Sequence, residues 1–219
     1  GMVYVTDTTE LGGVWDHGRL DAICDWAHDH DLAVFLDGAR LGSALTSPEN
    51  DLALEHIAQV ADAFTIGGTK NGMLMGEAVV IASERLRRAF PYLVKERGGL
   101  LAKGRLLGVQ FETAFEPAAD GGEALYWRLA RQANVCALRL RAGLVEAGFE
   151  PYGDAASNQQ FFVVTSEQAD AFERAVGCER FYALEDGRAV IRFVCSWATT
   201  EADVDELLAF ARGLASKAR

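Results

Sequence analysis

Short apolar runs alternate with amphipathic stretches along the first part of the chain. Each run is rich in β-branched or aromatic side chains, which is typical of strands buried on both faces. The runs predict four strands, at residues 3–6, 33–36, 63–66 and 78–81. Residues 17–28 and 52–60 carry apolar side chains three and four positions apart, which predicts helices between the strands. This alternation indicates βαβ units on a mostly parallel sheet.

The connections refine this arrangement. Asp16 follows a Gly12–Gly13 turn and is expected to cap the first helix, while Ser47–Asp51 supplies the residue types that begin the second helix. The glycine-rich segment Gly67–Gly72 leaves no room for a crossover helix before the fourth strand. The fourth strand is therefore expected to pair antiparallel with the third.

The second half of the chain is first helical and then mixed. Helical patterns cover residues 83–115 and 122–147, with a break at 116–122 that contains Pro117 and three glycine or aspartate residues. The remaining pattern predicts strands at 160–164 and 189–194, a helix at 167–176, and a last helix from Glu201 capped by Thr199 or Thr200. We therefore expect an α/β fold in two domains, a sheet domain at 1–122 and a small α+β domain at 123–219.

Composition narrows the class of protein. Half of the 219 residues are hydrophobic and 24% are charged, which is typical of a globular chain. The net charge of −11 disfavours binding to nucleic acid or to an anionic membrane, and no apolar stretch approaches the length of a membrane span. The four cysteines show no C-x-x-C spacing, so we expect reduced thiols in a cytoplasmic protein and no metal site.

Three charged residues follow the ends of predicted parallel strands, where an open α/β sheet binds its ligands. Asp37 and Arg40 follow the second strand, and Lys70 lies among glycines after the third. A lysine amine is activated where it is desolvated, and the glycines let a ligand approach closely. The alternatives are a solvated Lys70, a turn-capping Asp37 and a surface ion pair at Arg40.

Arg192 lies inside the apolar strand predicted at 189–194, where a guanidinium needs a carboxylate partner. The histidines are expected to be solvated rather than to bind ligands. They are His17, His28, His30 and His56.

Several stretches resemble the threonine aldolases of the beta-eliminating lyase group, which are fold type I pyridoxal-phosphate enzymes. The similar stretches are Phe35–Leu41, Phe64–Gly72, Gly104–Glu112, Asn158–Phe161 and Ile191–Thr200. They span nearly the whole chain. The resemblance implies the C-terminal portion of the family's large domain, with a mostly parallel sheet, followed by the small α+β domain.

The resemblance also implies roles for individual residues. Lys70 matches the lysine that holds the cofactor covalently, and Asp37 matches the aspartate that pairs with the pyridinium nitrogen. Arg40 and Arg192 match arginines associated with the cofactor ring or the substrate carboxylate, and Thr69 is placed near the cofactor phosphate. The implied activity is that of a carbon–carbon lyase that cleaves β-hydroxy-α-amino acids to glycine and an aldehyde.

Full members of that group carry a further segment ahead of the part that this chain matches. That segment holds the phosphate-binding turn and the residue that stacks on the cofactor ring, so we expect a truncated chain that binds the cofactor weakly. Two other hypotheses stay open: a non-catalytic remnant that serves as an interaction module, and an aminotransferase or β-eliminating enzyme. An uncovered sheet edge and apolar helix face predict a homo-oligomer, a dimer or more.

Overall fold

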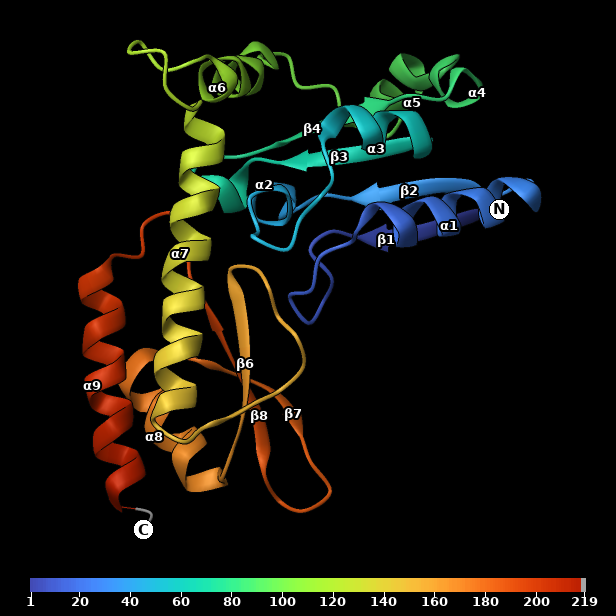
Figure 1. Cartoon of the computed structure of the whole chain (residues 1–219). Helices are drawn as coiled ribbons and strands as arrows, with labels where there is room; N and C mark the ends of the chain where they lie inside the picture. Colours follow the sequence, from blue (N-terminus) through green and yellow to red (C-terminus); the bar gives the residue numbers. More distant parts are fainter. Residues whose placement is uncertain (218–219) are drawn as a thin grey trace.

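Two β-sheets joined by one long helix organise the chain in the computed structural model, which describes residues 1–217 (Figure 1). The strands of the first sheet are β1 (Met2–Thr6), β2 (Ala33–Asp37), β3 (Ala63–Gly67) and β4 (Glu77–Ile81). They lie in the order β1-β2-β3-β4. The first three strands pair in parallel and β4 pairs antiparallel with β3, which confirms the prediction from the apolar runs and from the short connection before β4.

The helices of this half are α1 (His17–Asp29), α2 (Leu41–Leu45) and α3 (Leu54–Val60). Asp16 caps α1 as predicted, because its side chain accepts a hydrogen bond from the Arg19 amide at 2.8 Å. The predicted start of the second helix is wrong. Ser47 instead donates its hydroxyl proton to the Ala156 carbonyl at 2.8 Å, and α3 begins after Ala53 without a side-chain cap.

The helical stretch predicted at 83–115 is divided into three helices in the structure. They are α4 (Glu84–Arg87), α5 (Phe90–Glu96) and α6 (Arg105–Phe115). Pro91 lies in the first turn of α5, where a missing amide proton does no harm, and the backbone after α5 turns at Gly98 with a φ of 75°. Proline and glycine therefore divide a pattern that apolar spacing alone presents as continuous.

The second half contains the long helix and the second sheet. Its elements are α7 (Leu125–Glu146), β5 (Glu150–Pro151), β6 (Gln159–Val164), α8 (Ser166–Val176), β7 (Glu179–Ala183), β8 (Ala189–Val194) and α9 (Glu201–Lys217). The sheet is antiparallel in the order β5-β6-β8-β7. Thr200 caps α9, since its hydroxyl accepts from the Asp203 amide at 3.2 Å while Asp203 accepts from the Thr200 amide at 2.8 Å.

Helix α7 contributes to the cores of both halves. Tyr126 near its start is buried with the first sheet, whereas Leu140 and Leu144 near its end are buried with the second. Each fully buried side chain of this size contributes about 1.5–3 kcal/mol to folding. The boundary between residues 122 and 123 stays a prediction. Among the helices within residues 1–217, none has the length and apolar character needed to cross a bilayer.

Candidate active site at the carboxyl ends of two strands

The segments that follow β2 and β3 are in direct contact. The Gly38 amide donates to the Thr65 hydroxyl and the Gly67 amide donates to the Gly38 carbonyl, each at 2.9 Å. A Cβ atom at Gly38 would lie 2.0 Å from the Thr65 carbonyl oxygen, and one at Gly67 would lie 2.3 Å from the Ala39 carbonyl oxygen. Only glycine fits such a close approach. These two glycines therefore allow the segments that carry Asp37 and Lys70 to lie together.

Asp37 is the last residue of β2, and its carboxylate is held from two sides. Oδ1 accepts a hydrogen bond from the Ala39 amide at 2.9 Å, and Oδ2 accepts one from the Tyr4 hydroxyl on β1. The Tyr4 ring stacks on Phe35 with its centroid 5.5 Å away. The hydrogen bond to the carboxylate, more than burial, raises the pKa of Tyr4 to about 12. Asp37 thus caps a turn, which is the alternative to ligand binding given above, and its carboxylate is also held in a fixed position.

Lys70 lies in a short 3-10 helix, η1 (Thr69–Asn71), that follows β3. Helix α7 anchors this segment, since the Asn71 side-chain amide donates to the Tyr126 carbonyl at 2.9 Å and the Tyr126 hydroxyl donates to the Gly67 carbonyl at 3.0 Å. The Lys70 side chain is exposed, and its limited burial, followed by the positive charge of Arg40, lowers the pKa of Lys70. Within residues 1–217 the Lys70 amine has no ion-pair partner.

The two predicted arginines reach this region from different halves of the chain. Arg40 follows β2 and is half-buried, and burial, followed by the charge of Arg192, lowers its pKa. Arg192, on β8, pairs with Glu179 on β7 and donates to Gln159 Oε1 at 3.0 Å. Its Nε is buried without a hydrogen-bond partner among the described residues. The guanidinium therefore keeps an unused donor.

The structure brings Asp37, Arg40 and Lys70 into one site and places Arg192 close enough to affect Arg40. Thr69 lies next to Lys70 in η1 with an exposed side chain. The sequence analysis missed the residues that hold these groups. They are Tyr4, Gln159 and Glu179, together with Glu10, whose charge acts on Lys70 and Arg40. Only the β1–β2 register, in which Tyr4 pairs with Phe35 two residues before Asp37, could have indicated Tyr4.

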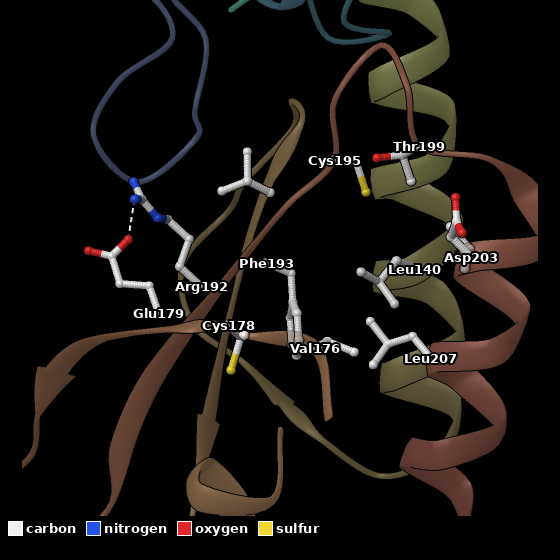
Figure 2. Close-up of a pocket in the computed structure, with 13 residues that line it drawn as sticks. Leu140, Val176, Cys178, Glu179, Arg192, Phe193, Cys195, Thr199, Asp203 and Leu207 are labelled. Atoms are coloured by element: carbon white, nitrogen blue, oxygen red, sulfur yellow. Dashed lines mark hydrogen bonds and ion pairs between the residues drawn. The ribbon is translucent and has the colours of Figure 1, made fainter. Parts of the chain in front are cut away.

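A cavity of about 390 Å³ lies elsewhere, between β8, α7 and α9 (Figure 2). Leu140, Phe193 and Leu207 form part of its apolar lining, while Arg192 and Glu179 lie on the opposite side from α9. Of the five predicted site residues, its lining within residues 1–217 includes Arg192 alone. The cavity therefore shares Arg192 and its partner Glu179 with the candidate site, whereas Lys70, Asp37 and Arg40 do not line it.

Solved structures show the same fold. The chain superimposes on Leishmania major threonine aldolase with a TM-score of 0.90 and 36% identity, covering 98% of this chain and 61% of that one. Sphingomonas wittichii serine palmitoyltransferase shares the fold alone, with a TM-score of 0.68, 14% identity, and coverage of 99% of this chain and 55% of that one. The fold is an α/β fold that matches part of the fold type I pyridoxal-phosphate enzymes.

Sequence comparison identifies the family. The family described as beta-eliminating lyase matches residues 1–179, and the chain belongs to that family. The chain is 32% identical over 216 residues to the low specificity L-threonine aldolase of a Pseudomonas species, covering 98% of this chain and 60% of that protein. Its identity to the enzyme of the same name from Pseudomonas aeruginosa is 32% over 208 residues, covering 94% of this chain and 57% of that protein. The chain thus spans less than two thirds of the length of these relatives.

Proposed function

We propose that the site around Lys70 binds pyridoxal phosphate and acts on β-hydroxy-α-amino acids, cleaving the Cα–Cβ bond to give glycine and an aldehyde. The observation that carries the proposal is the placement of Lys70, Asp37 and Arg40 together at the carboxyl ends of two neighbouring strands. The relatives named low specificity L-threonine aldolase support the choice of substrate class. L-Threonine would be converted to glycine and acetaldehyde.

Lys70 supplies the amine that would hold the cofactor. Because burial and Arg40 lower its pKa, more of the amine is unprotonated near neutral pH, and only the unprotonated amine is nucleophilic. Its freedom from ion pairs within residues 1–217 leaves it available for this bond. The glycines on both sides let η1 pack closely against the rest of the chain, because a Cβ atom at Gly68 would lie 2.6 Å from Met73 Sδ and one at Gly72 would lie 2.7 Å from Leu129 Cδ1.

Asp37 supplies the negative charge that a protonated pyridine nitrogen needs. Its carboxylate is oriented by the Ala39 amide and the Tyr4 hydroxyl, so the charge is fixed in position before a ligand binds. When bound, pyridoxal phosphate supplies an electron sink that stabilises negative charge at the substrate Cα. Asp37 would keep the ring nitrogen protonated and so maintain that capacity.

Arg192 and Arg40 supply positive charge for the α-carboxylate of the substrate. Arg192 already binds a carboxylate, that of Glu179, and retains an unpaired Nε donor. A substrate carboxylate that replaced Glu179 could form the two parallel hydrogen bonds that a guanidinium offers. Arg40 is close enough for Arg192 to lower its pKa, so one anion could reduce the repulsion between the two arginines.

The experiment is a titration of the purified chain with pyridoxal phosphate, followed by the visible absorbance band of cofactor bound covalently to lysine. We compare Lys70→Ala with Lys95→Ala, which removes an exposed lysine on α5. A saturable band in the parent and in Lys95→Ala that disappears in Lys70→Ala supports the proposed site. A band of equal size in all three proteins, or in none, overturns it.

Substrate cleavage has its own test. Incubation of the loaded chain with L-threonine should release glycine and acetaldehyde in equal amounts, and Lys70→Ala should abolish both. A saturable band without release of either product would contradict the lyase activity and favour a cofactor-binding protein without it. Release of an α-keto acid instead would favour aminotransferase or β-elimination chemistry.

A further inference from the structure

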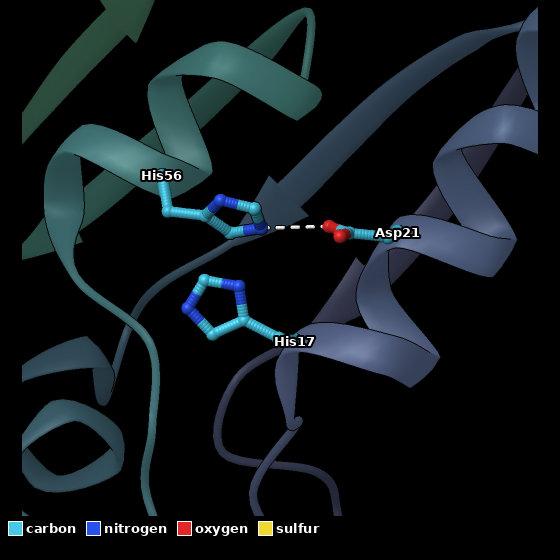
Figure 3. Close-up of side chains that lie close together, drawn as sticks. All are labelled: His17, Asp21 and His56. Carbon is cyan, nitrogen blue, oxygen red and sulfur yellow. Dashed lines mark hydrogen bonds and ion pairs between the residues drawn. The ribbon is translucent and has the colours of Figure 1, made fainter.

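Three side chains that can ligate a metal meet between α1 and α3 (Figure 3), and none of them belongs to the proposed active site. They are His17 and Asp21 on α1 and His56 on α3. His56 Nε2 lies 2.6 Å from Asp21 Oδ1, and the ring centroids of the two histidines are 3.9 Å apart. One donor atom from each residue lies within 4.8 Å of the other two.

The helices hold these residues in place. His17 and Asp21 are four residues apart, so they lie on the same side of α1, and this is the spacing that lets one helix offer two ligands to a single ion. Buried Leu20 and Ile57 belong to the core cluster beneath α1 and α3. The His17 backbone amide also donates to Asp51 Oδ1 at 2.9 Å. The ligand set therefore rests on packed helices rather than on loops.

The hydrogen bond between His56 and Asp21 explains why these two side chains lie together, but it does not explain the position of His17. Within residues 1–217, neither ring nitrogen of His17 has a hydrogen-bond partner. Its ring instead lies against the His56 ring, as Figure 3 shows, and the interplanar angle between the two rings is 42°. A cation shared by both rings and the carboxylate would use all three groups.

We propose that His17, Asp21 and His56 bind a divalent transition-metal ion of the zinc type, which bridges α1 and α3. Two imidazoles and one carboxylate suit zinc, whereas magnesium and calcium prefer oxygen ligands alone. Zinc bonds of about 2.0–2.1 Å place the ligand atoms of a tetrahedral site roughly 3.3 Å apart. His56 and Asp21 would separate slightly and His17 would turn toward them.

The site is open enough for an ion to enter and for water to serve as a fourth ligand. The side chains of His56 and Asp21 are 19% and 41% exposed. Because the two helices meet at the ion, binding should stabilise the folded chain and raise its melting temperature. This effect depends on no residue of the pyridoxal-phosphate proposal.

The test is calorimetric titration of the untagged chain with zinc chloride, together with thermal unfolding with and without zinc. We expect one equivalent of zinc to bind to the parent and to raise its melting temperature by several degrees. His17→Gln, His56→Gln and Asp21→Asn should each weaken binding by more than about tenfold, since even changes outside the ligand shell cost that much. Magnesium or calcium in large excess should not displace the zinc.

Matched controls separate this site from other zinc-binding side chains. His30→Gln removes an exposed histidine just after α1, and His28→Gln removes a histidine that lies on α1 and pairs with Asp62 ahead of β3. Both should bind zinc as the parent does, and so should Lys70→Ala. Circular dichroism of the zinc-free variants shows whether each one folds. Equal zinc affinity in folded His17→Gln, His56→Gln and the parent overturns the proposal, as does the absence of one-to-one binding to the parent.

Discussion

The hydroxyl of Tyr4 on β1 donates a hydrogen bond to Oδ2 of Asp37 at the end of β2. The two side chains come from neighbouring parallel strands, in which Tyr4 pairs with Phe35 and Asp37 lies two residues further on. Since side chains alternate along a strand, Phe35 and Asp37 point to the same side of the sheet as Tyr4. Tyr4 therefore orients the carboxylate proposed to face the cofactor ring.

Removing this hydroxyl should weaken cofactor binding without unfolding the chain. Tyr4→Phe keeps the ring that stacks on Phe35 and deletes only the hydrogen bond. We expect the dissociation constant for pyridoxal phosphate to rise roughly fivefold, which corresponds to about 1 kcal/mol for one exposed hydrogen bond to a carboxylate. Absorbance titration measures it, with the exposed Tyr92→Phe as control. Unchanged or tighter binding by Tyr4→Phe would show that the hydroxyl does not orient Asp37 for the ligand.

The Glu179 carboxylate pairs with the guanidinium of Arg192, which we propose binds the carboxylate of the substrate. Glu179→Gln removes the competing charge, so the KM for L-threonine should fall by several-fold while kcat changes little, an effect of about 1 kcal/mol. Arg192→Lys removes the planar pair of donors and should raise KM instead. Steady-state kinetics of glycine release provides both numbers. A rise in KM for Glu179→Gln would mean that Glu179 positions Arg192 rather than competing for it.

Asp7 makes the stability of the chain depend on pH. It is 1% exposed, its carboxylate oxygens have no partner among the described residues, and burial raises its pKa from about 3.8 to about 7. Because the raised pKa belongs to the folded chain, the stability that Asp7 contributes is fully present below about pH 4. It is lost as the pH rises toward 7, where the folded chain must hold a buried charge.

Asp7→Asn removes that ionisation. The free energy of unfolding of the variant, relative to the parent, should rise between about pH 4 and pH 7 and then level off. The total rise should be roughly 2–4 kcal/mol. Urea unfolding at several pH values measures it, and Asp154→Asn, which changes an exposed aspartate, should show no such trend. A difference between variant and parent that is constant with pH would contradict a raised pKa at Asp7.

The elements of the fold that could be predicted from the sequence are those determined by residues close to them in the chain. Asp16 caps α1 through its own side chain, and the short Gly67–Gly72 connection leaves β4 only an antiparallel neighbour. Strand β7 was missed because its residues are mostly exposed and its pairing with β8 is irregular, so no alternating apolar pattern marks it. The residue type of Ser47 predicts a helix start, but its hydroxyl donates a hydrogen bond to the carbonyl of Ala156, more than a hundred positions away.

The residues of the candidate site also fall into two groups, those that the sequence predicts and those that depend on contacts between distant strands. Asp37 and Lys70 could be predicted because strand ends and glycines are visible in the sequence. The partners of Asp37 and Arg192 could not be, since Tyr4 meets Asp37, and Gln159 and Glu179 meet Arg192, only through strand register. The pairing of His17 with His56 depends on how α1 packs beside α3, so the sequence could not indicate that these two rings are half-buried against each other, whereas His28 and His30 are exposed as expected.

An apolar patch on the surface predicts self-association. It consists of Leu74 and Met75 before β4 and of Leu106 and Val109 on α6, two segments joined by the hydrogen bond from the Leu74 amide to Gln110 Oε1 at 2.8 Å, and Leu74 and Leu106 are 86% and 68% exposed. Large apolar side chains clustered in this way mark protein interfaces. We expect light scattering with size exclusion to show a dimer or larger oligomer, and Leu106→Glu to shift it toward the monomer with unchanged circular dichroism. Val145→Glu, which changes an exposed side chain on α7, should leave the mass unchanged. A monomeric parent at micromolar concentration would contradict the prediction.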